Sequence, residues 1–103
     1  MSSEYPSIET LNALRQWPME DANGALDRLK SEWHWPDFGV SETLRPEEAA
    51  VLDASEGDRF LRLATGGWSG NESLVYAFRY SLAYILVWQL HARGGLWIFK
   101  YHQ

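Results

Sequence analysis

Apolar residues in the first third of the chain recur at the spacing of an α-helix. Ser7 is suited to cap a short helix predicted over residues 7–16, and the Trp17-Pro18 pair ends it. A second helix is predicted over residues 21–33. Its apolar side chains are spaced by four, three and four positions, namely Ala22, Leu26, Leu29 and Trp33. The chain therefore opens with two short amphipathic helices.

The segment that follows combines turn-forming residues with large aromatic ones. Residues 33–39 contain Pro, Asp and Gly beside three aromatic side chains, so we expect a loop that those side chains pin to the core. Pro46 suits the first turn of a third helix, with Glu47 and Glu48 at the positive end of its dipole. This short acidic helix is predicted to run to residue 54 and to stop by Gly57.

The second half of the chain predicts a strand, a long helix and another strand. Residues 59–64 suit a strand, residues 65–71 form a glycine-rich turn, and residues 71–92 predict a helix that is apolar on nearly every side. Residues 93–95, Arg-Gly-Gly, are expected to cap that helix, and residues 96–101 are strongly β-prone. The two strands can be parallel neighbours joined by a right-handed crossover. We predict a small mixed α+β fold: short N-terminal helices, then strand, long buried helix and strand.

Composition indicates one domain with ample apolar area. The 103 residues are 46% hydrophobic and include six Trp, so we expect a single core, with an acidic helical part over residues 1–58 and a strand–helix–strand part over residues 59–103. The chain has no cysteine, and its three histidines are scattered. We therefore predict neither a disulfide nor a metal site, and no cofactor.

Two observations bear on location. The N-terminus Met-Ser-Ser-Glu-Tyr-Pro lacks the basic and apolar regions of a secretory signal, so a cytoplasmic location is expected. Residues 74–90 form the longest apolar stretch, but Arg79 lies inside it, which favours a buried helix over a membrane span. We expect the Arg79 side chain to reach outward, towards a partner from the acidic half.

Charge is divided unevenly between the two halves of the chain. Residues 1–58 hold thirteen Asp or Glu and four Lys or Arg, whereas residues 59–103 hold one Glu and five Lys or Arg. An acidic half disfavours direct contact with nucleic acid and suits a basic protein partner, although an ordinary solvated surface explains the same charge. The expected contact residues are Trp68, Glu47, Glu48, Asp53, Glu56 and Asp58.

The glycine-rich turn admits three explanations. A phosphate can bind such a turn, but Glu72 stands near the place where a P-loop carries Lys and Ser or Thr. Residues 67–71, Gly-Trp-Ser-Gly-Asn, approach a nucleophile elbow, yet Asn71 replaces the last glycine and no acidic residue follows Glu72. A capping box from Ser69 to Glu72 explains the turn without a ligand. A ligand or enzymatic site at this turn would join Ser69, Asn71, Glu72 and Arg93.

Three features occur in an order that resembles a known group of proteins. They are Thr-Gly-Gly-Trp-Ser-Gly-Asn-Glu at residues 65–72, a Trp- and Tyr-rich segment, and Arg-Gly-Gly at residues 93–95. Over roughly residues 60–101 the chain resembles small uncharacterised proteins encoded by bacteriophages and prophages, whereas the acidic segment 1–58 has no counterpart there. The resemblance implies an accessory protein that binds and blocks a host protein, and it supplies no catalytic residues.

We therefore expect a non-enzymatic protein that binds a protein partner, as an inhibitor of a host nucleic-acid-binding or defence protein through its acidic face. Two alternatives stay open. One is a small-ligand or enzymatic site on the turn at residues 65–72. The other is a homo-oligomeric structural protein, in which the aromatic strand over residues 96–101 pairs edge to edge with its copy.

Overall fold

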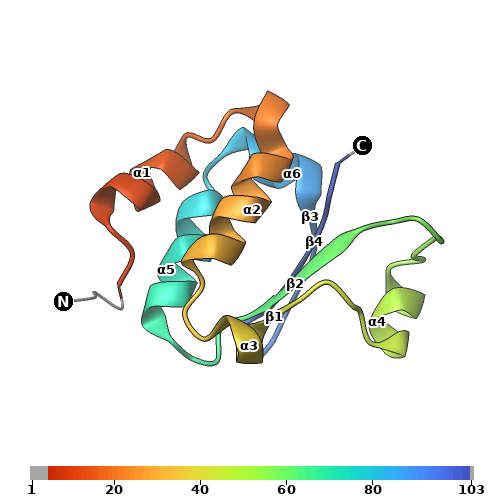
Figure 1. Cartoon of the computed structure of the whole chain (residues 1–103). Helices are drawn as coiled ribbons and strands as arrows, with labels where there is room; N and C mark the ends of the chain where they lie inside the picture. The colour runs from red at the N-terminus through yellow and green to blue at the C-terminus, as the bar shows by residue number, and fades with distance from the viewer. Residues whose placement is uncertain (1–4, 103) are drawn as a thin grey trace.

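A four-stranded antiparallel sheet organises the chain (Figure 1). The computed structural model describes residues 5–102. Its strand order is β1-β2-β4-β3, with α1, α2 and α5 on one side of the sheet and α4 on the other. The elements are α1 (Ile8–Arg15), η1 (Met19–Asp21), α2 (Ala22–Glu32), α3 (Pro36–Gly39), β1 (Val40–Ser41), α4 (Pro46–Val51), β2 (Phe60–Ala64), α5 (Ser69–Phe78), α6 (Leu82–Val87), β3 (Trp88–Ala92) and β4 (Leu96–Lys100). The predicted mixed α+β class is confirmed.

The N-terminal helices begin where the sequence predicts. Ser7 caps α1, because its hydroxyl oxygen accepts a hydrogen bond from the Thr10 N–H at 3.1 Å. Pro46 occupies the first turn of α4, where its missing N–H costs no hydrogen bond. That helix ends at Val51, however, because Asp53 already has a left-handed backbone with φ of 52°. The predicted extension of the helix to residue 54 is therefore wrong.

The predicted long helix over residues 71–92 is wrong, because this segment holds two helices and a strand. Ser81 separates α5 from α6: its hydroxyl donates to the Phe78 carbonyl at 2.8 Å and accepts from the Tyr84 N–H at 3.2 Å. β3 follows α6 directly and pairs with β4. Within residues 5–102, no helix is both long enough and apolar enough to cross a membrane.

The predicted parallel pairing of the two strands is also wrong. β2 and β4 are antiparallel neighbours, in register from Phe60 opposite Lys100 to Ala64 opposite Leu96. The physical reason is β3, which runs in the direction of β2 and then reverses into β4 through a tight hairpin. Residues 93–95 form that hairpin turn and do not cap a helix. β4 is therefore internal, and the edges of the sheet are β1 and β3.

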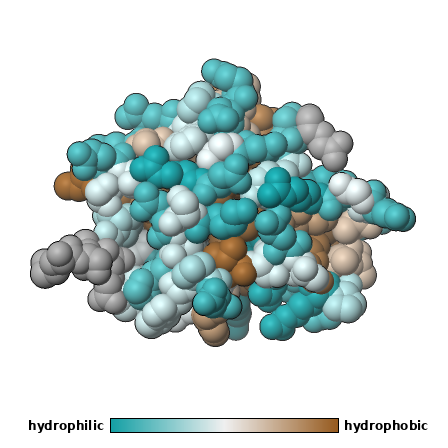
Figure 2. Space-filling view, in the orientation of Figure 1, coloured by the Kyte–Doolittle hydropathy of each residue, from teal (hydrophilic) through white to brown (hydrophobic). Residues whose placement is uncertain are grey.

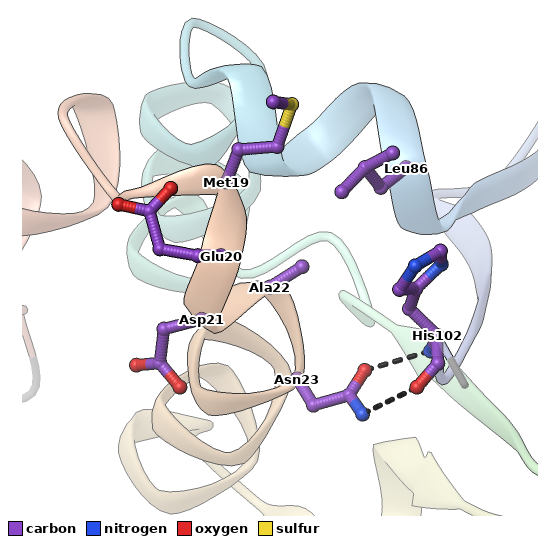
Figure 3. A pocket seen from close by; sticks show the side chains of 7 residues that line it. All are labelled: Met19, Glu20, Asp21, Ala22, Asn23, Leu86 and His102. Atoms are coloured by element: carbon purple, nitrogen blue, oxygen red, sulfur yellow. Dashed lines mark hydrogen bonds between the residues drawn. The ribbon is translucent and has the colours of Figure 1, made fainter.

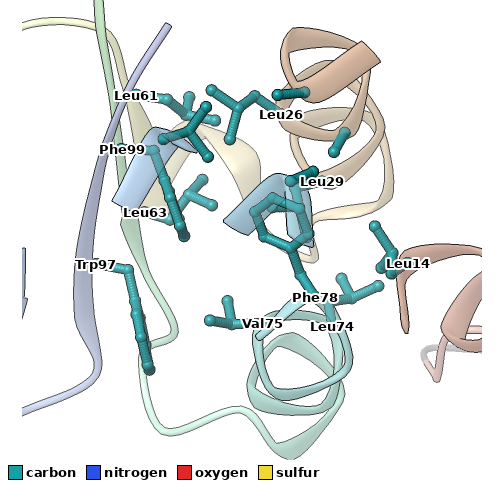
Figure 4. Packing of buried hydrophobic residues seen from close by; sticks show 14 of the residues in the cluster. Leu14, Leu26, Leu29, Leu61, Leu63, Leu74, Val75, Phe78, Trp97 and Phe99 are labelled. Carbon is teal, nitrogen blue, oxygen red and sulfur yellow. The ribbon is translucent and has the colours of Figure 1, made fainter. Parts of the chain in front are cut away.

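One hydrophobic core fills the space between the sheet and the helices (Figure 4). Alternate residues of β2 and β4 point into it, as the period of a strand requires. Phe78 of α5 is fully buried, and its ring lies 5.7 Å from the ring of Phe99 and 5.6 Å from that of Tyr84. Burying each large apolar side chain stabilises the fold by roughly 1.5–3 kcal/mol. The labelled members of this core are Leu14, Leu26, Leu29, Leu61, Leu63, Leu74, Val75, Phe78, Trp97 and Phe99.

The hairpin turn packs against the end of β2. The Thr65 N–H donates a hydrogen bond to the Gly95 carbonyl at 3.0 Å, which joins this turn to the glycine-rich turn. Gly94 and Gly95 both have positive φ, at 83° and 78°. A side chain at Gly95 would overlap the Thr65 hydroxyl, whereas a side chain at Gly94 would point into open space.

We predict that Gly95→Ala destabilises the protein much more than Gly94→Ala. Each substitution places alanine in the left-handed region, at a cost of about 1–2 kcal/mol, but only Gly95→Ala also displaces buried Thr65. We expect a total loss of about 3 kcal/mol or more for Gly95→Ala, measured as the free energy of unfolding in urea. Equal losses for the two variants would contradict the proposed packing of the turn.

Candidate functional site

Three loops meet at one end of the sheet, and we call this region the loop end. It consists of the loop over residues 33–39, the turn over residues 65–68 and the hairpin turn over residues 93–95. The bond from Thr65 to Gly95 joins the two turns. The first loop is fixed by Trp33, whose indole N–H donates to the Ala64 carbonyl at 3.1 Å. The loop end is therefore a braced surface and not a set of free loops.

Asn71 supplies the strongest brace of the loop end. Its side chain is 2% exposed, and its Oδ1 accepts from the His34 N–H at 2.8 Å. Its Nδ2 donates to the carbonyls of His34 at 3.0 Å and Thr65 at 3.4 Å. Both amide hydrogens are thus used within the chain. Asn71, proposed from sequence as a ligand residue, instead positions the first loop against the turn.

Trp35 and Phe38 form the exposed surface of the loop end. Trp35 is 54% exposed and Phe38 is 72% exposed. Trp35 has φ of 59° and ψ of 58°, a left-handed conformation that strains a residue with a side chain by about 1–2 kcal/mol. The expectation that the aromatic side chains pin this loop to the core is thus right for Trp33 and wrong for the other two. Phe38 lies instead beside Gly66 of the glycine-rich turn.

Trp68 supports this surface from within. Its ring stacks on the His34 ring at 4.6 Å and lies 5.5 Å from the Trp35 ring. Its indole nitrogen is buried and has no hydrogen-bond partner within residues 5–102. Trp68, predicted from sequence as a contact residue, is therefore half-buried in an aromatic cluster with His34 and Trp35. Trp35 is the exposed member of this cluster.

The other residues of the predicted ligand site do not converge. Ser69 is the first residue of α5 and accepts a hydrogen bond from the Tyr5 hydroxyl at 2.6 Å. The predicted capping box is wrong, because the N-cap is Trp68 and no side chain caps that end. Glu72 is half-buried on α5, and Arg93 is exposed in the hairpin turn. Within residues 5–102, no hydrogen bond or ion pair joins Ser69, Glu72 and Arg93 to one another.

The acidic residues proposed for partner contact lie elsewhere. They precede β2, whereas the turn that carries Trp68 follows it, and Figure 1 shows α4 apart from that turn. Glu47, Asp53 and Glu56 are exposed. Asp58 pairs with Lys100 at 3.4 Å, and the pKa of its carboxyl is lowered by the Ser55 N–H and by that lysine. Trp68 and the acidic residues therefore do not form one surface.

The charge difference between the two halves is partly neutralised inside the molecule. Glu42 pairs with Arg59 at 2.8 Å, and Asp58 pairs with Lys100. In both pairs the acid comes from residues 1–58 and the cation from residues 59–103. Arg79 does not follow this pattern. Its guanidinium lies 5.8 Å from the Tyr76 ring and 5.9 Å from the Trp97 ring, and no carboxylate within residues 5–102 pairs with it.

Glu48 forms the most buried of these ion pairs. Its carboxylate accepts from Arg62 Nε at 3.0 Å and 3.1 Å, and the two side chains are only 10% and 16% exposed. Burial raises the pKa of Glu48, but the hydrogen bonds from Arg62 and from the Arg45 N–H together hold it below its ordinary value of 4.5. Glu48, predicted as a contact residue, instead fastens α4 to the sheet.

A cleft of about 520 Å³ lies between η1, the start of α2, Leu86 and the C-terminal segment (Figure 3). Asn23 closes one side, because its amide bonds both the N–H and the carbonyl of His102 at 2.7 Å. The carboxylates of Glu20 and Asp21 point away from the His102 ring (Figure 3). Within residues 5–102, no three His, Asp or Glu side chains gather to hold a metal ion. The cleft therefore lacks convergent polar groups.

The exposure of Trp35 and Phe38 was missed from sequence, although the pattern carries a signal. Residues 36–39, Pro-Asp-Phe-Gly, allow a single helical turn that begins at proline and ends at glycine. Trp35 precedes this turn as its N-cap and Phe38 lies within it, so both rings belong to the same short segment. Figure 2 shows a largely hydrophilic face of the molecule.

The comparisons with known proteins return nothing: no family model matches the chain, and neither a curated protein nor a solved structure is detectably similar to it. The geometry of the loop end therefore carries the functional argument by itself.

We predict that Glu48→Gln destabilises the protein by about 2 kcal/mol at pH 7, because Arg62 loses its charged partner in a buried site. The folded-state pKa of Glu48 lies below its unfolded value, so this stabilisation is present above pH 4.5 and is lost as the pH falls through the folded pKa. Urea unfolding at pH 7 and near pH 3 measures both effects. A difference between the variant and the wild type that stays constant with pH would contradict the assignment.

Proposed function

We propose that this chain is a non-enzymatic protein-binding module whose contact surface is the loop end, with Trp35 and Phe38 as anchors. The observation that carries the proposal is the backbone of Trp35, which holds a half-exposed indole in a strained left-handed conformation. Strain of this kind persists only where the surrounding structure enforces it, and it concentrates at functional positions. The bonds of Asn71 to His34 and the stacking of Trp68 provide that enforcement.

The chemistry of the loop end favours a protein over a small polar ligand. Exposed Trp is enriched among residues that dominate protein interfaces, and two large exposed rings at positions 35 and 38 of one loop supply such an anchor. Two polar residues of the same region are engaged within the chain, because both amide hydrogens of Asn71 are used and Ser69 accepts from Tyr5. The charged side chains of Asp37 and Arg93 are also exposed in these loops, so the support for a protein partner comes from the two aromatic rings.

The partner expected at this surface is apolar and need not be basic. The acidic residues proposed from sequence lie away from the loop end, and two of them are engaged in ion pairs within the chain. A phage origin and the inhibition of a host nucleic-acid-binding or defence protein remain predictions from the resemblance.

Trp35→Gly is expected to weaken partner binding without changing the stability of the fold much. Glycine adopts φ of 59° without strain, so relief of about 1–2 kcal/mol offsets the lost contacts of the ring with His34 and Trp68. We expect the free energy of unfolding to change by less than about 1 kcal/mol. Loss of an anchor worth about 2 kcal/mol weakens partner binding roughly thirtyfold. Quantitative capture of partners from a lysate of the encoding organism, with tagged wild type and variant, measures this loss.

Phe38→Ala should weaken capture of the same partner, because its ring is 72% exposed on the same loop as Trp35. Tyr80→Ala is the matched control, because Tyr80 is 80% exposed in the turn after α5, outside the loop end. Its capture should equal that of the wild type. A partner retained equally by Trp35→Gly and Tyr80→Ala would rule out the loop end as the contact surface.

A further inference from the structure

The two edges of the sheet are protected to very different degrees. β1 has only two residues and is followed at once by Glu42, whose charge opposes the addition of another strand. β3 has five residues, and its outer backbone groups face no neighbouring strand within residues 5–102. A shift in register between Trp88 and Leu90 disturbs its beginning, but residues 90–92 pair regularly with β4. The β1 edge is thus protected against pairing with another strand, and the β3 edge is largely unprotected.

The segment around β3 carries no formal charge. Residues 80–92 contain no Asp, Glu, Lys, Arg or Pro, although charged residues make up 22% of the chain. Apolar side chains beside this edge are exposed: Ile85 is 72% exposed and Trp88 is 42% exposed, and both line one groove with His91 of β3. Natural sheets place charge or proline on an open edge to prevent pairing with another strand. β3 itself has neither device, although the exposed Arg93 follows it directly, and its apolar neighbours extend the exposed surface onto α6.

We propose that β3 pairs antiparallel with β3 of a second copy of this chain, so that two four-stranded sheets continue into one sheet of eight strands. Around a two-fold axis, each edge offers the other the same free N–H and carbonyl groups. The exposed side chains of Ile85 and Trp88 then pack against their counterparts, which buries surface that is otherwise in water.

The absence of charge is what selects a second copy as the occupant. A strongly charged partner would find no opposite charge on residues 80–92. Two copies bring no like charges from residues 80–92 together, although Arg79 lines the same groove as Ile85 and Trp88 and each chain carries a net charge of −5. Because that net charge repels at long range and salt screens it, association of two copies should strengthen as ionic strength rises. A contact based on opposite charges would weaken under the same change.

The oligomeric mass of three proteins tests this pairing. We expect wild-type protein at about 100 μM to show twice the 11.9 kDa chain mass by size exclusion with light scattering, with more dimer at higher salt. Ile85→Lys should shift the mass to one chain, because the two copies would place like charges in contact. Ile8→Lys is the matched control, since Ile8 is 75% exposed on α1, which Figure 1 shows apart from β3, and should stay dimeric. Circular dichroism checks that both variants remain folded.

Amide hydrogen exchange shows whether β3 itself forms the contact. The N–H groups of residues 88–92 that face away from β4 should exchange slowly in wild type and at least tenfold faster in Ile85→Lys. A wild-type mass of 11.9 kDa at all concentrations overturns self-pairing and leaves the edge to a different chain. A dimer that Ile85→Lys does not disturb, or one in which these amides exchange freely, overturns it as well.

Discussion

β4 hydrogen-bonds to β2 on one side and to β3 on the other, and its Trp97 and Phe99 rings fill the core beneath α5 and α6. The other features of the molecule depend on this central position. The hairpin that returns the chain from β3 brings Gly95 against Thr65, and so joins the two turns of the loop end. The same hairpin places β3 at the edge of the sheet. A parallel arrangement of β2 and β4 would have produced neither feature.

The loop end shows how a rigid support can hold a strained residue. The side chain of Asn71 forms hydrogen bonds with the backbone of His34, and the His34 ring stacks on Trp68. Trp35 follows directly and is held in a conformation that it would not adopt in a free loop. The strain costs about 1–2 kcal/mol, which is small beside the burial of the core side chains around Phe78. A stable core thus permits one unfavourable residue at the surface.

The division of charge along the chain has a structural role inside the fold. Glu42, Glu48 and Asp58 from the acidic half pair with Arg59, Arg62 and Lys100 from the basic half. These contacts tie α4 and its flanking loops to the sheet, across the face opposite the main core. These ion pairs therefore neutralise part of the charge asymmetry between the two halves of the chain. Residues 80–92 carry no formal charge and take no part in these ion pairs.

The local features can be predicted from the amino-acid pattern alone: the cap of α1 at Ser7, the apolar face of α2, proline at the start of α4, and the mixed class of the fold. Each of these depends on neighbouring residues, whose spacing is visible in the chain. Tertiary structure decided where residues 71–92 break, because an apolar run satisfies a buried helix and a strand equally well until its pairing partner is known. It also decided the exposure of Trp35 and the burial of Glu48. Those outcomes depend on contacts with residues distant in sequence, namely Trp68 and Arg62, so a local pattern can allow them but cannot decide them.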